Sequence, residues 1–272
     1  MLPFPSPLAI PFQRFEWREQ DNLCYFQYMG RSKFTDLYAL TQGPNFRKGF
    51  EKIYLYGSSG SGKSHILAAL ACCLIWEGKR VVYVPDCSLL LADFAQTIRI
   101  ALSCAFYDSQ KHLKTIESAR NVDALIDFCH KQTDIHFIVD QLNALELGGR
   151  NKNSDDTKRR VKESLGRMTL LQKYIFSASA NEQSNQVADQ KQSGITVVRI
   201  NGGMNQVCRN CNAPGIILTS FRRKRISGLF IMPQTFRHYQ TKNVSSSVIL
   251  LGAFRFCFVL FSTASSSTNP TS

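Results

Sequence analysis

Eight residues that begin at Gly57 have the types and the spacing that bind a triphosphate. They read Gly-Ser-Ser-Gly-Ser-Gly-Lys-Ser and fit G-x-x-x-x-G-K-[ST], the phosphate-binding P-loop, without a substitution. Glycine lets the backbone curl into a concave nest, in which several N–H groups point at one phosphate. The Lys63 ammonium can neutralise the β- and γ-phosphates, and the Ser64 hydroxyl can ligate Mg²⁺. We therefore expect the nucleotide to be bound by Gly57, Ser58, Ser59, Gly60, Ser61, Gly62, Lys63 and Ser64.

The second candidate group follows the apolar run 135–139. In P-loop enzymes an Asp at the carboxyl end of a neighbouring strand holds the Mg²⁺ shell, and Asp140 has this position. Most ring ATPases continue with a Glu that activates water, whereas this chain has Gln141, which can orient water but is a poor base. The nearest downstream carboxylate is Glu146. The sequence thus predicts Mg²⁺ ligation by Ser64 and Asp140, and slow hydrolysis that uses Lys63, Asp140, Gln141 and Glu146.

Two further pairs of residues are candidates for contact with the nucleotide. Gly30 and Arg31 follow two apolar residues, a pattern that resembles the adenine-side motif of signal-transducing and origin-recognition ATPases. Ser179 and Asn181 follow a later apolar run, where a polar residue senses the γ-phosphate in additional-strand P-loop ATPases. For both pairs an ordinary turn is the alternative. Residues 151–155 approximate the guanine-reading N-K-x-D, but the Asp falls one residue late and no strand precedes it, which favours ATP.

The elements that must position these groups alternate between strand and helix. Apolar runs predict buried parallel strands, and apolar residues at helical spacing predict helices between them. Strands are expected at 53–56, 81–84, 136–140, 174–179 and 195–200, and helices at 32–40, 65–76, 88–107, 121–131 and 161–171. This alternation predicts an α/β fold, the P-loop three-layer sandwich with a mostly parallel central sheet. The nucleotide is then expected at the carboxyl ends of the strands.

Composition restricts the class of protein. Of the 272 residues 44% are hydrophobic and 19% are charged, which is typical of a globular protein rather than a disordered one. The nine cysteines lie mostly inside apolar runs, which argues against a disulfide framework. The net charge is +13, but residues 190–272 hold ten Lys/Arg and no acid. The first 189 residues, with 23 Lys/Arg and 20 Asp/Glu, carry only +3, so the basic character belongs to the tail.

The changes in composition and charge along the chain predict three segments. We expect an extended, proline-rich arm at 1–24, a P-loop NTPase domain at 25–206 and a basic, poorly defined tail at 207–272. The start of the chain lacks the basic and apolar regions of an ordinary secretion signal. The apolar run 248–261 has fourteen residues and contains Arg255, so we expect no membrane span. We interpret the tail as disordered, or as a divergent, truncated or mistranslated end.

Several segments together resemble the P-loop NTPase module of Crinkler-type (crinkling-and-necrosis) effectors. The resemblance is carried by the P-loop with its flanks at 53–70, by Val-Val-Tyr-Val-Pro-Asp-Cys at 81–87, by Ile-Val-Asp-Gln-Leu-Asn-Ala-Leu at 138–145 and by Ser-Ala-Ser-Ala-Asn at 177–181. It covers about residues 25–206 of the chain. This chain departs from the family at both ends, because no targeting header precedes residue 25 and no typical helical region follows Met204.

From the P-loop, Asp140 and Gln141 we expect binding of ATP and Mg²⁺ and slow hydrolysis that drives a conformational switch, here in a Crinkler-like effector. The resemblance implies a secreted protein that enters host cells and host nuclei, with a host protein or DNA as partner; a header-less cytoplasmic relative is the alternative. The run 62–70 equally resembles helicase-loader and transposition-helper ATPases, which act on DNA as homo-oligomers. A third hypothesis is a nucleotide-bound interaction scaffold without turnover, which Gln141 favours.

Overall fold

The structure is a computed structural model of the whole chain. It describes residues 2–8, 15, 17–20, 23–28, 30–49, 51–147, 155–179 and 194–200. The chain divides into two compact units, Met1–Ile217 and Leu218–Ser272. Every described residue belongs to the first unit, so the fold and the site are those of that unit. The tail predicted at 207–272 lies outside the described residues, and its boundary stays a prediction.

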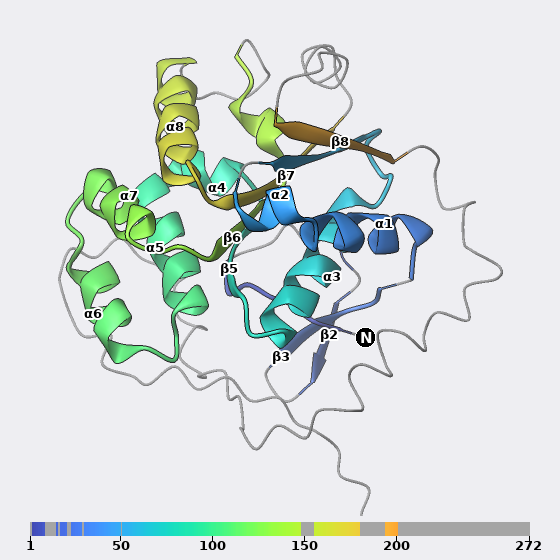
Figure 1. Cartoon of the computed structure of the whole chain (residues 1–272), viewed down its shortest axis with the longest axis horizontal. Coiled ribbons are helices and arrows are strands. Elements are labelled where there is room, and N and C mark those ends of the chain that lie inside the picture. Colours follow the sequence, from blue (N-terminus) through green and yellow to red (C-terminus); the bar gives the residue numbers. More distant parts are fainter. Residues whose placement is uncertain are drawn as a thin grey trace, which may run out of the picture. The chain divides into compact units, whose positions relative to one another are not determined.

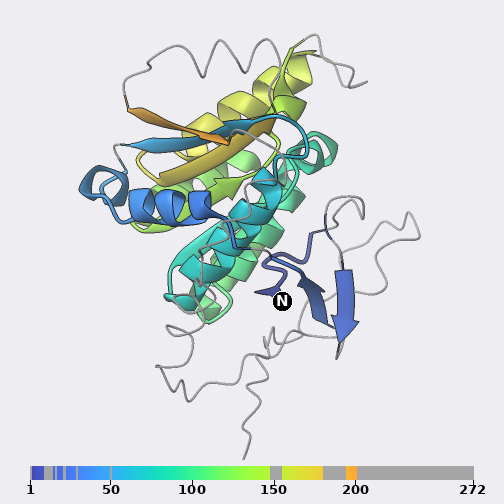
Figure 2. The same ribbon diagram turned by 90° about the vertical axis from the view of Figure 1, so that its right-hand side faces the viewer.

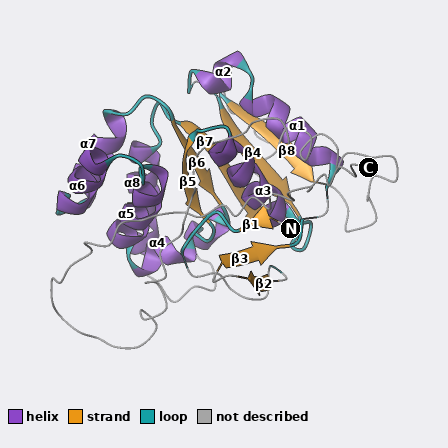
Figure 3. Cartoon of the chain, turned by 90° about the horizontal axis from the view of Figure 1, so that it is seen from below, coloured by secondary structure: helices purple, strands orange, loops and turns teal. Residues whose placement is uncertain are grey.

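A five-stranded parallel sheet forms the centre of this unit (Figure 1). Its strands are β4 (Lys52–Gly57), β5 (Arg80–Val84), β6 (Ile135–Val139), β7 (Lys173–Ser179) and β8 (Ile195–Ile200). They pair in the order β5-β6-β7-β4-β8, as Figure 3 shows, and all four pairings are parallel. The strands are rich in Val, Ile, Tyr and Phe, as sheets covered on both faces require. The predicted α/β fold with a mostly parallel central sheet is confirmed.

Helices cover both faces of the sheet, which gives three layers (Figure 3). Side chains alternate between the faces along each strand, so Ile53 and Leu55 enter one hydrophobic core and Tyr54 enters the other. The first core contains α1 (Ser32–Thr41), α2 (Pro44–Arg47) and α3 (Lys63–Trp76). The second contains α4 (Ser88–Ala92), α5 (Phe94–Ala105), α6 (Gln110–Ser118), α7 (Val122–His130) and α8 (Asp155–Met168). In the part of the chain that the structure describes, no helix is both long and apolar enough to cross a bilayer.

Several helical segments differ from the sequence prediction. The helix expected at 161–171 is α8, which runs over Asp155–Met168; Leu171 lies beyond it, 70% exposed and with φ of 61°. Helix α2 has no predicted counterpart.

The single helix expected at 88–107 is divided at Asp93 into α4 and α5. Asp93 has an extended backbone with φ of −155°, and its carboxylate accepts a hydrogen bond of 2.9 Å from the Gln96 N–H. This side chain caps α5 and ends the run of α4. Helix α6 has no counterpart among the predicted helices, because its segment is polar and buries only Leu113 and Ile116.

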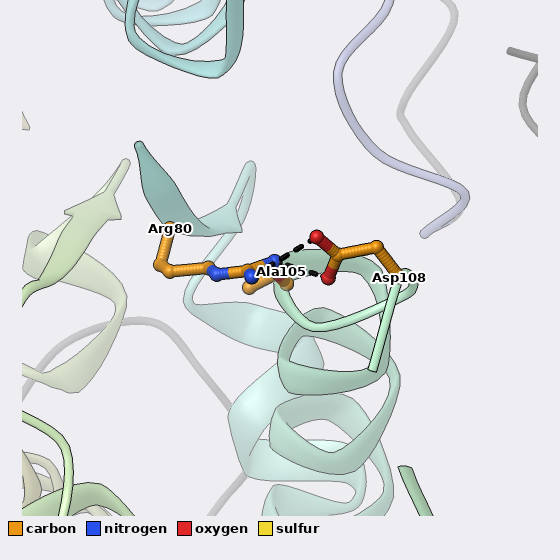
Figure 4. A network of polar contacts seen from close by, with 3 residues as sticks. All are labelled: Arg80, Ala105 and Asp108. Atoms are coloured by element: carbon orange, nitrogen blue, oxygen red, sulfur yellow. Dashed lines mark hydrogen bonds and ion pairs between the residues drawn. The ribbon is translucent and has the colours of Figure 1, made fainter. Parts of the chain in front are cut away.

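One polar network joins the start of β5 to the end of α5 (Figure 4). Arg80 Nη1 donates to the Ala105 carbonyl oxygen at 3.0 Å, and the guanidinium pairs with both carboxylate oxygens of Asp108. The same guanidinium lies over the Phe106 ring, 5.2 Å from its centroid. Such a two-pronged ion pair fixes direction as well as distance. The network therefore fastens α5 at the amino edge of the sheet, opposite the P-loop.

A small antiparallel sheet is formed by the amino-terminal residues, apart from the five-stranded sheet (Figure 2). Its strands, β1 (Leu2–Pro3), β2 (Trp17–Gln20) and β3 (Leu23–Phe26), pair in the order β1-β3-β2. The rings of Phe4, Phe15 and Phe26 pack edge to face, with centroids 5.2 to 6.0 Å apart. Phe15 also lies 4.6 Å from the ring of His65 in α3. The arm predicted at 1–24 thus contributes buried rings to the core beside α3.

Candidate nucleotide-binding site

The P-loop connects β4 to α3 at the carboxyl edge of the sheet. Gly60 and Gly62 have left-handed backbones, with φ of +77° and +85°, which residues with a Cβ rarely adopt. Gly57 has no room for a side chain, since a Cβ there would lie 2.6 Å from the Ile200 carbonyl oxygen. The exposed residues of the loop are Ser58, Ser59 and Gly60. The loop therefore has the curled backbone that the motif predicts, and α3 begins directly after it.

The Lys63 side chain folds back over its own loop. Its Nζ donates hydrogen bonds to the carbonyl oxygens of Gly57 at 2.7 Å and of Ser58 at 2.8 Å. The residue is 7% exposed. Burial lowers the pKa of Lys63, and the negative charge of Asp140 opposes this shift. The Lys63 ammonium thus lies inside the loop, and the charge of the Asp140 carboxylate acts on it.

Asp140 directly follows β6 and is 1% exposed. Its Oδ1 accepts a hydrogen bond of 2.9 Å from the backbone N–H of Gln141 and another from the hydroxyl of Ser177 in β7. Gln141 has φ of 61° and ψ of 46°, a left-handed conformation that is uncommon for a residue with a Cβ. In this conformation its N–H points at the carboxylate. The Asp140 side chain is therefore held by the turn after β6 and by β7 together.

Ser179 ends β7 and lies beside the P-loop. The parallel register pairs Ser179 with Gly57. Its backbone N–H donates to Oδ1 of Asn143 at 3.2 Å, and Asn143 belongs to the 3₁₀ turn η1 (Leu142–Leu145). Ser179, the predicted γ-phosphate sensor, thus lies at the same carboxyl edge of the sheet as the P-loop. Its role stays a prediction. Asn181, the other candidate, lies outside the described residues.

Arg31 reaches the P-loop with its side chain. Its Nη1 donates to the Ser61 carbonyl oxygen. Gly62 leaves the space that the guanidinium occupies, because a Cβ at this glycine would lie 2.6 Å from Arg31 Cζ. Gly30, which precedes it, is exposed, and a Cβ there would meet nothing within 4 Å. A residue predicted on the adenine side therefore also contacts the phosphate loop, while the contact of its backbone with the base stays a prediction.

The oxygen donors at this edge fit Mg²⁺. This cation prefers oxygen ligands and is commonly held by one or two carboxylates together with the phosphates of a nucleotide. Asp140 supplies a buried carboxylate, and Ser64 supplies a half-buried hydroxyl in the first turn of α3. Across the described ranges, no group of three or more His, Cys, Asp or Glu could hold a metal by itself. When bound, Mg²⁺ would neutralise charge on the phosphates. Glu146 follows η1, and its role stays a prediction.

Two residues of the site, Ser177 and Asn143, are not singled out by sequence reasoning. Ser177 interrupts the apolar run of β7, and a hydroxyl inside a predicted buried strand is a sequence signal for a polar contact. In the structure Ser177 is buried on the strand next to β6, which leads to Asp140. Its contact with Asp140 nevertheless depends on the order and register of β6 and β7, which the sequence does not state. Asn143 gives no such signal, because its contact requires the 3₁₀ turn after Gln141.

The order of the strands and the loop together define the class of protein. β7 lies between the P-loop strand β4 and the strand β6 that leads to Asp140. One additional strand therefore separates the P-loop strand from the strand that leads to Asp140, which makes this chain a P-loop NTPase fold of the additional-strand type. The nucleotide edge is the one where parallel strands of such sheets place their ligands.

Comparison with known proteins relates part of the chain to a replication initiator. No protein-family model matches the chain. A 91-residue alignment is 57% identical to the chromosomal replication initiator protein DnaA 2 of Protochlamydia amoebophila (strain UWE25), and it covers 30% of this chain and 19% of that protein. The similarity therefore spans about a fifth of the length of that relative.

Solved structures show weaker similarity. AMPPCP-bound DnaA from Aquifex aeolicus has a TM-score of 0.37 and 20% identity, over 65% of this chain and 48% of that chain. PCH-2 from C. elegans has a TM-score of 0.34 and 13% identity, over 61% of this chain and 42% of that chain. These TM-scores are low, so the fold class rests on the strand order and the P-loop themselves.

Proposed function

We propose that this chain binds ATP together with Mg²⁺ at the carboxyl edge of its parallel sheet. The observation that supports this most strongly is the convergence of Lys63 and Asp140. The ammonium is buried inside the P-loop, where the charge of the carboxylate acts on it. A cation for the phosphate oxygens and a carboxylate for the metal are the two protein groups that binding of Mg·ATP needs.

In this proposal hydrolysis is slow, because the position after Asp140 holds an amide. The Gln141 N–H is used in holding Asp140, and its side-chain amide can orient a water molecule but accepts a proton poorly. Glu146, which follows η1, is the carboxylate that we assign to the water. Tight binding with slow turnover suits a protein whose bound nucleotide switches its conformation.

We further propose that the ATPase acts with DNA as a homo-oligomeric helper of the replication-initiator or helicase-loader type. The support is the 91-residue alignment at 57% identity to a chromosomal replication initiator protein. The sequence run 62–70, which includes the last three residues of the P-loop, resembles the same group of ATPases. The basic residues of 190–272 would strengthen binding to the phosphate backbone in a manner that salt weakens.

A Crinkler-type effector is the second candidate function. Its support is the pair of segments 81–87 and 138–145, which are not general features of P-loop proteins. In that case the same nucleotide site would serve a secreted protein that acts in host cells or their nuclei. A rate of ATP turnover that is the same with and without DNA would favour the effector over the DNA-associated ATPase.

The test measures nucleotide binding and ATP turnover by the full chain, with and without single- and double-stranded DNA. Lys63→Ala should weaken binding of a fluorescent ATP analogue about 10- to 100-fold, because it removes hydrogen bonds between charged groups. Asp140→Asn should abolish turnover and the Mg²⁺ dependence of binding. The matched control is Lys33→Ala, since Lys33 is 44% exposed and pairs with Asp36 on α1.

Each outcome separates the candidates. Unchanged affinity in Lys63→Ala would refute the nucleotide site. Turnover that DNA stimulates supports the helper ATPase, and turnover without a DNA effect contradicts it. Tight binding without any turnover would refute the ATPase and leave a nucleotide-bound scaffold.

A further inference from the structure

We propose that Ser177 is the positioning residue for the Mg²⁺-binding carboxylate and couples β7 to the metal side of the site. This inference rests on the proposed function, because it requires Mg·ATP beside Asp140. Ser177 is 0% exposed and lies in the strand between the P-loop strand and the strand that leads to Asp140. Its effect on the nucleotide is therefore indirect and passes through the carboxylate.

Three hydrogen bonds form a closed network among Asp140, Gln141 and Ser177. The Ser177 hydroxyl donates to Asp140 Oδ1. The Gln141 N–H donates to the same Oδ1 at 2.9 Å and lies 3.3 Å from Ser177 Oγ. A hydroxyl can donate and accept at once, which neither an N–H nor an ammonium can do. Because both donors act on one oxygen, they fix the rotation of the carboxylate and the direction of Oδ2.

The register of β7 explains why this strand supplies the group. Ser177 pairs with Leu55 of β4, and Ser179, two residues later, pairs with Gly57. Residues two apart in a strand point to the same face. β7 thus touches the carboxylate through Ser177 and runs beside the P-loop at Ser179, so a displacement of this one strand changes both halves of the site.

The positioning role and a purely structural role predict different results. Loss of an outer hydrogen-bond partner of a metal ligand lowers metal affinity about 10- to 100-fold. A hydroxyl that only stabilised the fold would change the free energy of unfolding and leave the dependence on Mg²⁺ unaltered. The two roles are therefore distinguished by the half-maximal Mg²⁺ concentration, which is the free Mg²⁺ concentration that gives half of the full increase in nucleotide affinity.

The experiment titrates a fluorescent ATP analogue against the full chain over a range of free Mg²⁺ and in EDTA. In Ser177→Ala the half-maximal Mg²⁺ concentration should rise at least about tenfold, while the affinity in EDTA stays that of the wild type. Ser177→Thr, which keeps the hydroxyl, should restore the wild-type value. The control is Thr169→Val, because Thr169 is equally buried and donates to the Leu165 carbonyl oxygen at 2.9 Å, before the amino end of β7.

A Ser177→Ala variant with wild-type Mg²⁺ dependence would overturn the inference while leaving the nucleotide site intact. If that variant does not fold, Ser177→Cys, which is nearly the same size and a weaker donor, provides the measurement. Wild-type protein that binds no nucleotide would refute the proposed function and this inference with it. A shift in Thr169→Val as large as that in Ser177→Ala would show that lost stability, and not position, is the cause.

Discussion

Gln141 occupies the position where a carboxylate would activate water, and its backbone is left-handed with φ of 61°. The contact that this residue makes with Asp140 comes from its backbone N–H. The orientation of Asp140 therefore does not depend on which side chain residue 141 carries. For that reason the side chain of residue 141 can be changed without removing this contact to Asp140.

Gln141→Glu should raise ATP turnover. A carboxylate can accept the proton of the attacking water, and general-base catalysis contributes about 10² to 10⁴-fold to rates. We expect an increase of about tenfold or more in steady-state turnover, with unchanged affinity for the ATP analogue. Gln141→Ala is the control and should show no gain. Glu146→Gln should be inactive, because we assign that carboxylate to the water. A Gln141→Glu variant that is no faster than the wild type would contradict our expectation that a carboxylate at residue 141 can also reach the water.

Two helices on the second face of the sheet, α5 and α7, begin at residues whose side chains bind the backbone. Asp93 accepts the Gln96 N–H, and Asn121 accepts the Ala124 N–H, each at 2.9 Å. These caps start α5 and α7, which pack in one hydrophobic core.

Asp93→Ala and Asn121→Ala should each lower the free energy of unfolding by about 1 kcal/mol, which is the usual cost of a lost N-cap. Urea denaturation measures the loss. Asp127→Ala, at an exposed position inside α7, is the control, and it should stay within about 0.5 kcal/mol of the wild type. A loss at Asp127 equal to that at Asn121 would contradict the capping role.

The sequence predicts the elements whose signals are local. The five strands are largely apolar, with polar exceptions such as Ser177 in β7 and Arg199 in β8, so their positions follow from their hydrophobic pattern, and parallel pairing follows from their alternation with helices. The P-loop and Asp140 could be predicted from the sequence because the phosphates and Mg²⁺ require particular residue types at these positions, and the number of residues between them is typical of P-loop proteins. The break between α4 and α5 at Asp93 could not be predicted, since apolar residues lie on both sides of Asp93. The Ser177 contact could not either, because it requires the register between β6 and β7.

Buried ionisable groups link the stability of the whole unit to pH. His136 in β6 is 3% exposed, and its ring lies 6.2 Å from that of Phe46 in α2. Burial, assisted by the nearby charge of Lys173, lowers the pKa of His136 from 6.5 to about 4. The folded protein therefore holds this imidazole neutral, while the unfolded chain takes up the proton near pH 6.5.

His136 should make the protein less stable in acid. As pH falls from 6.5 to about 4 the unfolded chain binds one more proton than the fold, so stability is complete above this window and is lost within it. The loss is at most about 1.4 kcal/mol per pH unit. The free energy of unfolding of wild type and His136→Phe, measured by urea from pH 4 to pH 8, isolates this term. A difference between the two proteins that does not change with pH would contradict it.

The strand order also bears on how the chain is completed during synthesis. β4 is paired by β7 on one side and β8 on the other, and both are made long after it. A nascent chain leaves the ribosome from its amino end, so the P-loop emerges early on a strand with unpaired N–H and C=O groups. Such an unpaired strand is open to contact with other chains until its partners arrive. The P-loop is thus translated before both strands that flank β4, and it gains a complete sheet only when β8 has been made.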